Sequence, residues 1–340
     1  MGDRLVLLAT TPRVAPGLLT DEAWSLLRQA DVVHLADDDH PLVAPLATAG
    51  IAASLLPAHP AADLAVRLLD AARGRTVVWV ASADGDPGLA EALVPALDAA
   101  GAPAVDVVLG SWDLPGAHLL DLVAVMDRLR SPGGCPWDAE QTHESLVEYL
   151  VEEAYETVEA IETRDDDALR EELGDLLLQV AFHARIAEEH DEPWGIDDVA
   201  DGIAAKLVRR HPHVFADHEA RTPDEVEASW KRLKAEEKQR ASVTDGIPVS
   251  LPALVLAGKL LRRASDVDVA AASPEASAAA RVALGSLGAH DASSRSTAYG
   301  DLLLAVAALA HADGVDAEQA LRESLRAYRA RIRTTEGLPD

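Results

Sequence analysis

Apolar and polar residues repeat with two different periods along the chain, and the change of period divides it into regions. Up to about residue 114, short apolar runs such as Leu5–Ala9 and Thr76–Val80 alternate with segments of helical period. The other apolar runs lie at 32–35 and 105–109, and the helical segments lie at 21–30, with Thr20 as N-cap, at 64–72, and from residue 89 to Ala100. Strands that alternate with helices predict a parallel sheet, so we expect an α/β domain over residues 1–114.

Beyond residue 115 the apolar positions recur every three or four residues, which is typical of helices that bury one face. This pattern predicts helices at 119–129, 166–190, 196–210 and 224–239, the third of them ended by Pro212. Ser145 and Glu148 have the spacing of a capping box and predict that another helix opens there. We therefore place one helical domain at 115–245 and a second at 246–340.

Two acidic clusters lie in the first helical domain, on either side of a polar turn at residues 163–166. They consist of Glu152, Glu153 and Glu156 before the turn and of Glu171, Glu172 and Asp175 after it. Spacings of three or four residues place carboxylates on one face of a helix. In an antiparallel hairpin that turns at Arg164, Glu153 lies opposite Asp175 and Glu156 opposite Glu172, because the members of each pair are equally far from the turn.

Four carboxylates that converge repel one another unless cations lie between them, and an all-oxygen ligand set suits Mg²⁺ or Mn²⁺. Most Glu-rich helices are simply solvated faces, which is the alternative. Here, however, the acids interrupt an apolar stripe that we expect to form the packing face of the hairpin. The stripe consists of Leu146, Leu150, Val151, Tyr155, Val158 and Ile161, followed by Leu169, Leu173, Leu176, Leu177 and Val180. Charges at the edge of a core favour a site over a solvated face.

The composition excludes several classes of protein. A net charge of −28 argues against binding to nucleic acid and to anionic membranes. The single cysteine, Cys135, allows no internal disulfide, and no apolar run approaches the ~18 residues of a membrane span. With no recognisable signal peptide at the start, we expect a soluble cytoplasmic protein.

Part of the second acidic helix recurs later in the chain. Residues 174–181, which begin Gly-Asp-Leu-Leu-Leu, reappear as residues 300–307. With that shift Asp175 corresponds to Asp301, whereas Glu153, Glu156 and Glu172 correspond to Ala279, Val282 and Ala298. We interpret residues 246–340 as a second copy of the helical module that has lost its metal site; coincidence between two amphipathic helices is the alternative.

Several strings between residues 122 and 234 closely resemble the MazG family of nucleoside triphosphate pyrophosphohydrolases. They are Gly134-Cys-Pro-Trp-Asp138, Glu140-Gln-Thr-His143, Tyr149-Leu-Val-Glu-Glu153, Arg170-Glu-Glu-Leu-Gly-Asp175, the stretch from Lys206 to Phe215, and Trp230 with Lys234. The resemblance covers about a third of the chain. It implies an all-α module that hydrolyses nucleoside triphosphates, non-canonical or damaged ones among the candidates, to monophosphate and pyrophosphate with Mg²⁺. The metal motifs of the family, EExxE and ExxD, fall on Glu152, Glu153, Glu156, Glu172 and Asp175.

The flanking regions resemble parts of related proteins. Residues 251–333 look like a degenerate second MazG-like module, which keeps Leu251-Pro-Ala-Leu254 and Lys259-Leu-Leu-Arg-Arg263. Residues 1–114 look like a shortened tetrapyrrole-methylase-like domain, with Gly85-Asp-Pro87 among the matching strings. The first loop of that domain, Ala9–Arg13, has no glycine to approach a cofactor, so we expect this domain to be non-catalytic.

We assign roles to these residues as hypotheses. Glu153, Glu156, Glu172 and Asp175 hold the metal ions, water attacks the α-phosphorus, and Glu152 acts as general base or orients the water. The remaining substrate contacts are assigned to Lys206, Arg209, Arg210, Trp230, Lys234 and Arg170. The cations at 206–210 have an alternative role at a helix C-terminus. For Trp137 we favour a place in the core over base stacking, and for His143, His211 and His213 we favour packing.

Two other functions compete with hydrolysis. A di-iron carboxylate bundle also gathers acids from helices, but it typically needs Glu-x-x-His pairs that neither cluster supplies. A non-enzymatic protein that senses a nucleotide and its metal at the same site is the second alternative. Because one hairpin covers a nucleotide poorly, we also expect a homodimer. Cover by the degenerate second module within one chain is the alternative.

Overall fold

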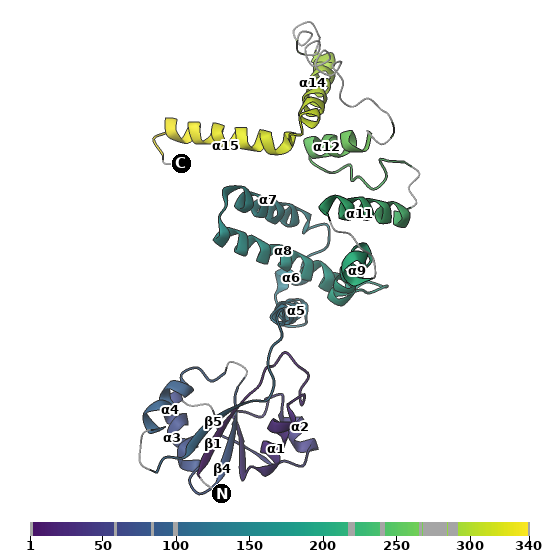
Figure 1. Cartoon of the computed structure of the whole chain (residues 1–340). Coiled ribbons are helices and arrows are strands. Elements are labelled where there is room, and N and C mark those ends of the chain that lie inside the picture. The colour runs from purple at the N-terminus through teal and green to yellow at the C-terminus, as the bar shows by residue number, and fades with distance from the viewer. Residues whose placement is uncertain are drawn as a thin grey trace. The chain divides into compact units, whose positions relative to one another are not determined.

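The computed structural model of the chain describes residues 3–57, 60–82, 85–97, 101–216, 222–238, 242–264 and 292–338, together with residues 267 and 284 (Figure 1). The chain divides into two compact units, Met1–Ala204 and Ala205–Asp340. The first unit contains a sheet followed by helices, and the secondary-structure elements in the described part of the second unit are helices.

The first unit opens with a five-stranded parallel sheet. Its strands are β1 (Arg4–Ala9), β2 (Val32–Leu35), β3 (Ala53–Leu55), β4 (Thr76–Val80) and β5 (Ala104–Leu109), in the spatial order β3-β2-β4-β1-β5. All neighbouring strands pair in parallel, so the predicted α/β fold with a parallel sheet is confirmed. The sequence did not reveal β3, because its three residues are exposed and give no apolar run.

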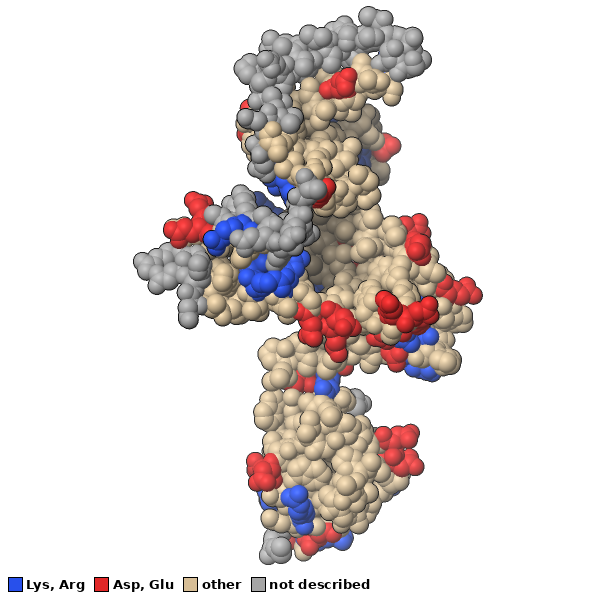
Figure 2. All heavy atoms as spheres, turned by 90° about the vertical axis from the view of Figure 1, so that its right-hand side faces the viewer, with Lys and Arg blue, Asp and Glu red and all other residues tan. Residues whose placement is uncertain are grey.

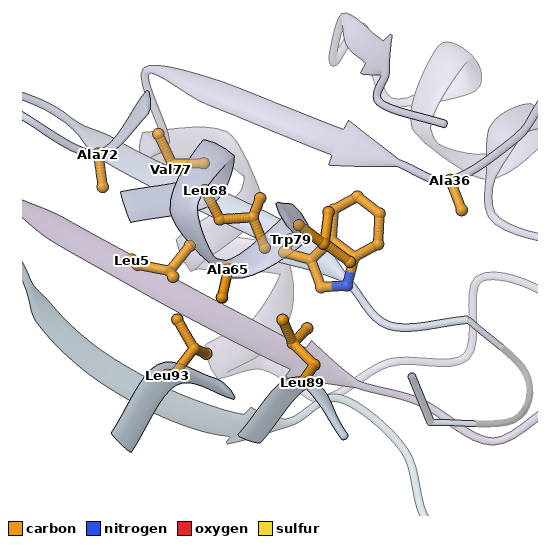
Figure 3. Packing of buried hydrophobic residues seen from close by; sticks show 10 residues of the cluster. Leu5, Ala36, Ala65, Leu68, Ala72, Val77, Trp79, Leu89 and Leu93 are labelled. Atoms are coloured by element: carbon orange, nitrogen blue, oxygen red, sulfur yellow. The ribbon is translucent and has the colours of Figure 1, made fainter. Parts of the chain in front are cut away.

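Helices cover both faces of this sheet. The helices α1 (Asp21–Gln29) and α2 (Val43–Thr48) pack on the side chains of Val6 and Leu8, whereas α3 (Ala61–Ala71) and α4 (Leu89–Leu97) pack on the opposite face. Figure 3 shows the second of these cores, in which Trp79 lies fully buried beside Leu68. A strand buried on both faces reads as a continuous apolar run, as β4 does.

Local signals locate the ends of these elements to different degrees. Thr20 caps α1, since its hydroxyl accepts a hydrogen bond from the N–H of Ala23 at 3.2 Å, as predicted. The helix α2 was missed because it has only six residues and contains Pro45. The predicted end of α4 at Ala100 lies outside the described residues.

Four helices complete the first unit before α9. They are α5 (Leu119–Arg130), α6 (Pro136–Glu140), α7 (Val147–Thr163) and α8 (Asp166–Ala187). A small core of Met126, Leu146, Phe182 and Ile186 joins α5, the start of α7 and α8. The second acidic helix, α8, ends at Ala187, whereas the sequence predicted an end at His190.

The helices α7 and α8 form the predicted hairpin, which turns at Arg164 (Figure 1). Arg164 ends α7 in the left-handed conformation, with φ 59° and ψ 41°. The next residue, Asp165, caps α8 by accepting a hydrogen bond from the N–H of Ala168 at 3.0 Å. A left-handed residue followed directly by an N-cap reverses the chain within two residues.

The predicted capping box at the start of α7 is wrong. The N-cap of α7 is Leu146, which makes no side-chain capping bond. The hydroxyl of Ser145 instead accepts a hydrogen bond from the N–H of Thr142 at 3.0 Å, and the N–H of Ser145 donates to the hydroxyl of Thr142 at 3.2 Å. The preceding turn therefore uses the group that the sequence assigned to the helix.

The second unit is built from helices. The unit boundary falls inside α9 (Ile196–Arg210), and the later elements are α10 (Pro212–Phe215), α11 (Pro223–Lys238), α12 (Ala253–Ala264), α14 (Ala292–Ala312) and α15 (Ala317–Thr335). Ala257, Leu261, Ala307 and Ala308 form a small buried core. Gly300 and Asp301 lie in α14, while Ala279 and Val282 and the predicted helix end at Gln239 lie outside the described residues.

Within the described ranges, no single helix has the length and apolar character to cross a membrane. One bent pair, Arg295–Ala312 with Ala317–Thr335, meets the length and composition test only when its two helices, at 107° to each other, are taken together.

Candidate functional site

Three carboxylates converge between α7 and α8. Glu153 and Glu156 come from α7 and Glu172 from α8, and one oxygen of each lies within 4.8 Å of the others. Glu153 and Glu172 are half-buried, whereas Glu156 is exposed. The turn at Arg164 sets this register, because it brings residues at equal distances along the chain opposite each other.

Burial and like charge act together on this cluster. Partial burial raises the pKa of Glu153, and the negative charges of Asp175, then Glu156 and Glu172, raise it further. Partial burial also raises the pKa of Glu172, with the charges of Glu156 and then Asp175 next in size. The strongest charge effects thus follow the pairs expected from the hairpin, Glu153 with Asp175 and Glu156 with Glu172.

The donor set fits a hard cation. Within the described part of the chain, none of Glu153, Glu156 and Glu172 forms an ion pair with Lys or Arg. A cation between the carboxylates would remove the repulsion that raises their pKa values. Carboxylate oxygens without imidazole or thiolate are the ligands of Mg²⁺, Mn²⁺ and Ca²⁺. The cluster can therefore bind a metal ion.

Besides Asp175, whose charge raises the pKa of Glu153, two other predicted site residues lie on the hairpin. Glu152 is exposed next to Glu153, and its charge is the weakest of those that raise the pKa of Glu153. Arg170 does not pair with the cluster: its guanidinium donates to Asp167 at 3.1 Å, and its side chain is 82% exposed. A solvent-exposed pair one turn apart contributes little to stability, so Arg170 remains available to another anion.

The remaining predicted substrate contacts belong to the second unit. Lys206 and Arg209 are exposed on α9, but Arg210 is buried, and its guanidinium carbon lies 5.2 Å from the centre of the Trp230 ring. Arg210 and Trp230 thus form a cation–π pair within this unit. The side chain of Lys234 lies outside the described residues. Figure 2 shows acidic side chains spread widely over the visible face and Lys and Arg in fewer places.

Much of the apolar stripe of the hairpin is exposed, although the sequence predicted a buried face; Leu146 is its buried member. Val151, Tyr155 and Ile161 of α7 are 48%, 42% and 56% exposed, and Leu173 and Leu177 of α8 are 47% and 44% exposed. The buried positions of α7 are Thr157 and Ala160 instead. An apolar surface of this kind beside a polar site marks a surface that another chain can cover.

Two further assignments differ between sequence and structure. The side chain of Trp137 is 52% exposed, so the predicted core position is wrong. The centres of the Trp137 and Tyr149 rings are 6.1 Å apart, in an edge-to-face arrangement. No local pattern in the sequence revealed Arg130, whose buried guanidinium binds Glu189 and the carbonyl oxygens of Asp138 and Gln141. Its burial distinguishes Arg130 from the exposed arginines, and local spacing does not show burial.

The fold and the site define an α/β domain followed by a helical region with a candidate metal centre of carboxylates. Comparison with known proteins identifies that helical region. A family model described as the MazG nucleotide pyrophosphohydrolase domain matches residues 141–215. The chain is similar to an uncharacterized 26.1 kDa protein in the blaB 3' region of Streptomyces cacaoi, with 50% identity over 262 residues, which are 76% of this chain and 100% of that protein.

Two relatives carry functional names. The nucleoside triphosphate pyrophosphohydrolase/pyrophosphatase MazG of Thermotoga maritima is 41% identical over 222 residues, which are 64% of this chain and 85% of that protein. The nucleoside triphosphate pyrophosphohydrolase of Escherichia coli K12 is 41% identical over 231 residues, which are 63% of this chain and 86% of that protein. The chain therefore belongs to the MazG nucleotide pyrophosphohydrolase family.

Proposed function

We propose that this protein hydrolyses nucleoside triphosphates to monophosphates and pyrophosphate. The convergence of Glu153, Glu156 and Glu172 within 4.8 Å carries the proposal, because it concentrates negative charge where a triphosphate must be held through cations. The activity for which the relatives in Thermotoga maritima and Escherichia coli are named supports it. Non-canonical or damaged nucleotides are candidate substrates.

We assign separate roles to the residues of the hairpin and to the cations and Trp230 that follow it. Glu153, Glu156, Glu172 and Asp175 hold Mg²⁺, with Mn²⁺ as the alternative ion. When bound, the metal neutralises the phosphates and makes a water molecule more acidic. Glu152, exposed beside the cluster, accepts a proton from the attacking water or orients it. Lys206 and Arg209 bind phosphates, Trp230 and Lys234 contact the nucleotide, and Arg170 adds a cation at the start of α8. Arg210, which the sequence also assigned to the phosphates, is buried against the Trp230 ring and supports that ring instead.

The test compares two aspartates at equivalent places in the repeated sequence. Asp175→Asn is expected to abolish Mg²⁺-dependent release of pyrophosphate and monophosphate from a nucleoside triphosphate. The matched control, Asp301→Asn, changes the counterpart in α14 and is expected to retain activity. Release of inorganic phosphate and diphosphate would contradict attack at the α-phosphorus. Nucleotide binding with no turnover in the unmodified protein would instead support a nucleotide-sensing role.

The exposed apolar stripe supports a homodimer. Tyr155, Ile161 and Leu173 lie on neighbouring helices and are 42%, 56% and 47% exposed. A second hairpin on this face would complete a four-helix core and enclose the carboxylates. Sedimentation of the unmodified protein is expected to give a dimer and Ile161→Arg a monomer. An unmodified protein that sediments as a monomer would exclude this assembly.

The flanking parts serve other roles in this proposal. We assign residues 1–114 to a shortened methylase-like domain, 115–245 to the hydrolase and 246–340 to a degenerate second copy. The guanidinium of Arg13, in the loop after β1, binds Asp113 and Asp121 at 2.5 Å each, which fills the loop where a cofactor would approach. This contact supports a non-catalytic role for the first domain. We place the protein in the cytoplasm.

A further inference from the structure

Two histidines meet where the hairpin begins and ends. His143 precedes α7 and His183 lies in α8, and their Nδ1 atoms are 2.7 Å apart. The ring centres are 5.0 Å apart and the ring planes differ by 15°. The distance between the ring centres exceeds the distance between the Nδ1 atoms by about the width of one imidazole ring. The two Nδ1 atoms therefore lie between the ring centres, and the rings face each other edge to edge. This geometry is an N–H···N hydrogen bond, in which one ring donates and the other accepts.

The surroundings decide which ring donates. Nε2 of His183 is buried and has no hydrogen-bond partner among the described residues. A buried N–H without an acceptor is costly, so His183 carries its proton on Nδ1 and leaves Nε2 bare. His143 then accepts at Nδ1 and carries its own proton on Nε2.

This pair has no place for an additional proton. A proton on Nε2 of His183 would create a buried charge and a buried N–H with no acceptor. A proton on Nδ1 of His143 would point its N–H at the N–H on Nδ1 of His183, and two donors repel. His183 could avoid this only by moving its proton to Nε2, which is buried and has no acceptor among the described residues. In agreement, burial lowers the pKa of His183, and the neighbouring His143 lowers it further.

Few other charges act on the pair. Glu144 follows His143 directly, and the ring of His190 meets the ring of His143 edge-on at 5.2 Å. The first charged residue of α7 is Glu148. The charged residues where α5 meets α8 bind one another: Arg130 with Glu189, and Arg185 with Asp127, Glu188 and Glu189.

We propose that His143 and His183 form a proton-operated latch that holds the segment before α7 against α8. The neutral pair is closed, and one additional proton opens it. The pKa of His183 is lower in the closed form than its ordinary value of 6.5. The closed form is therefore favoured at pH values above 6.5 and becomes less stable relative to the open form as the pH falls below 6.5. Since α7 and α8 also carry Glu153 and Glu172, the latch sits at the open end of the helix pair that presents the carboxylates.

Nitrogen NMR of the histidine rings tests the proton positions in the unmodified protein. Near pH 7.5, His183 is expected to be protonated on Nδ1 and not on Nε2. Hydrogen exchange then tests the latch: after correction for intrinsic pH dependence, the amides of residues 142–150 should lose at least tenfold protection below pH 6, whereas those of β4 should not.

One variant keeps the hydrogen bond whether or not His143 is protonated. In His183→Asn, the side-chain amide can donate its N–H to Nδ1 of a neutral His143 or accept with its carbonyl oxygen from Nδ1 of a protonated one, so protection of residues 142–150 should persist at low pH. His118→Asn, at a side chain that is 76% exposed, should behave like the unmodified protein. A proton on Nε2 of His183 at pH 7.5 would overturn the latch, whether or not the variant folds. Equal loss of protection in His183→Asn and the unmodified protein would also overturn it. Neither readout depends on turnover.

Discussion

Replacing Arg130 by Met should show how much one buried guanidinium contributes to the helical part of the first unit. The side chain of Arg130 is only 3% exposed, and it donates to both oxygens of Glu189, at 3.1 and 2.9 Å. Its third nitrogen donates to the carbonyl oxygens of Asp138 and Gln141. Arg130 thus joins α5 to α6 and its C-cap, and to the turn after α8. Methionine keeps an apolar stem of similar length and removes all of these bonds.

The expected loss in the free energy of unfolding depends on which partners of Arg130 are left without a hydrogen bond. Breaking a buried ion pair typically costs about 3–5 kcal/mol when the other charge has no partner. Glu189, however, is 44% exposed and keeps a bond to Arg185 at 2.9 Å, so its charge is not stranded. The two carbonyl groups each lose a donor, at about 1 kcal/mol per bond. We expect the free energy of unfolding to fall by about 2–3 kcal/mol.

Urea unfolding at pH 7, followed by circular dichroism, measures this change. Arg170→Met is the matched control, because that side chain is 82% exposed and should change the free energy of unfolding by less than about 0.5 kcal/mol. Hydrogen exchange of residues 136–141 shows whether the loss is local to the segment that Arg130 binds. A change below about 0.5 kcal/mol for Arg130→Met would refute the reasoning.

The same pair predicts a dependence on pH. The bond from Arg130 is the largest of the effects that lower the pKa of Glu189 below its ordinary value of 4.5. A carboxyl whose pKa is lower in the folded state stabilises that state above the unfolded pKa, and this contribution disappears as the pH falls through the folded value. The difference between the unmodified protein and Arg130→Met should therefore shrink below pH 4.5. A constant difference down to pH 3 would show that Glu189 is not the relevant partner.

Three further changes test other parts of the structure. A methyl group at Gly134 would overlap the carbonyl oxygen of Leu129, so Gly134→Ala should destabilise the first unit by about 1–3 kcal/mol in urea unfolding. Gly202 in α9 has open space around it, and Gly202→Ala should stabilise by about 0.5–1 kcal/mol through helix propensity. In a thermal-shift assay, Glu172→Gln should raise the melting temperature of the metal-free protein, because it removes a repelling charge, and should reduce the further rise caused by Mg²⁺.

The sequence by itself determined the features that depend on nearby residues. The bounds of α9, the cap at Thr20 and the turn at Arg164 all follow from residues within one or two helical turns of each other. The convergence of Glu153, Glu156 and Glu172 belongs to this group as well. In a hairpin with a tight turn, residues at equal distances from the turn lie opposite each other. The position of the turn in the sequence therefore also predicts the contact between the carboxylates of α7 and α8.

Tertiary structure decided what depends on residues far apart in the sequence. Arg130 meets Glu189, and His143 meets His183, only because α5 and the start of α7 pack on α8. The same packing gives the hydroxyl of Ser145 to a turn instead of a helix cap. It also leaves Tyr155 exposed, although its helical period is that of a buried stripe. Periodicity shows that a face is apolar, but only the arrangement of the other elements determines whether that face is covered.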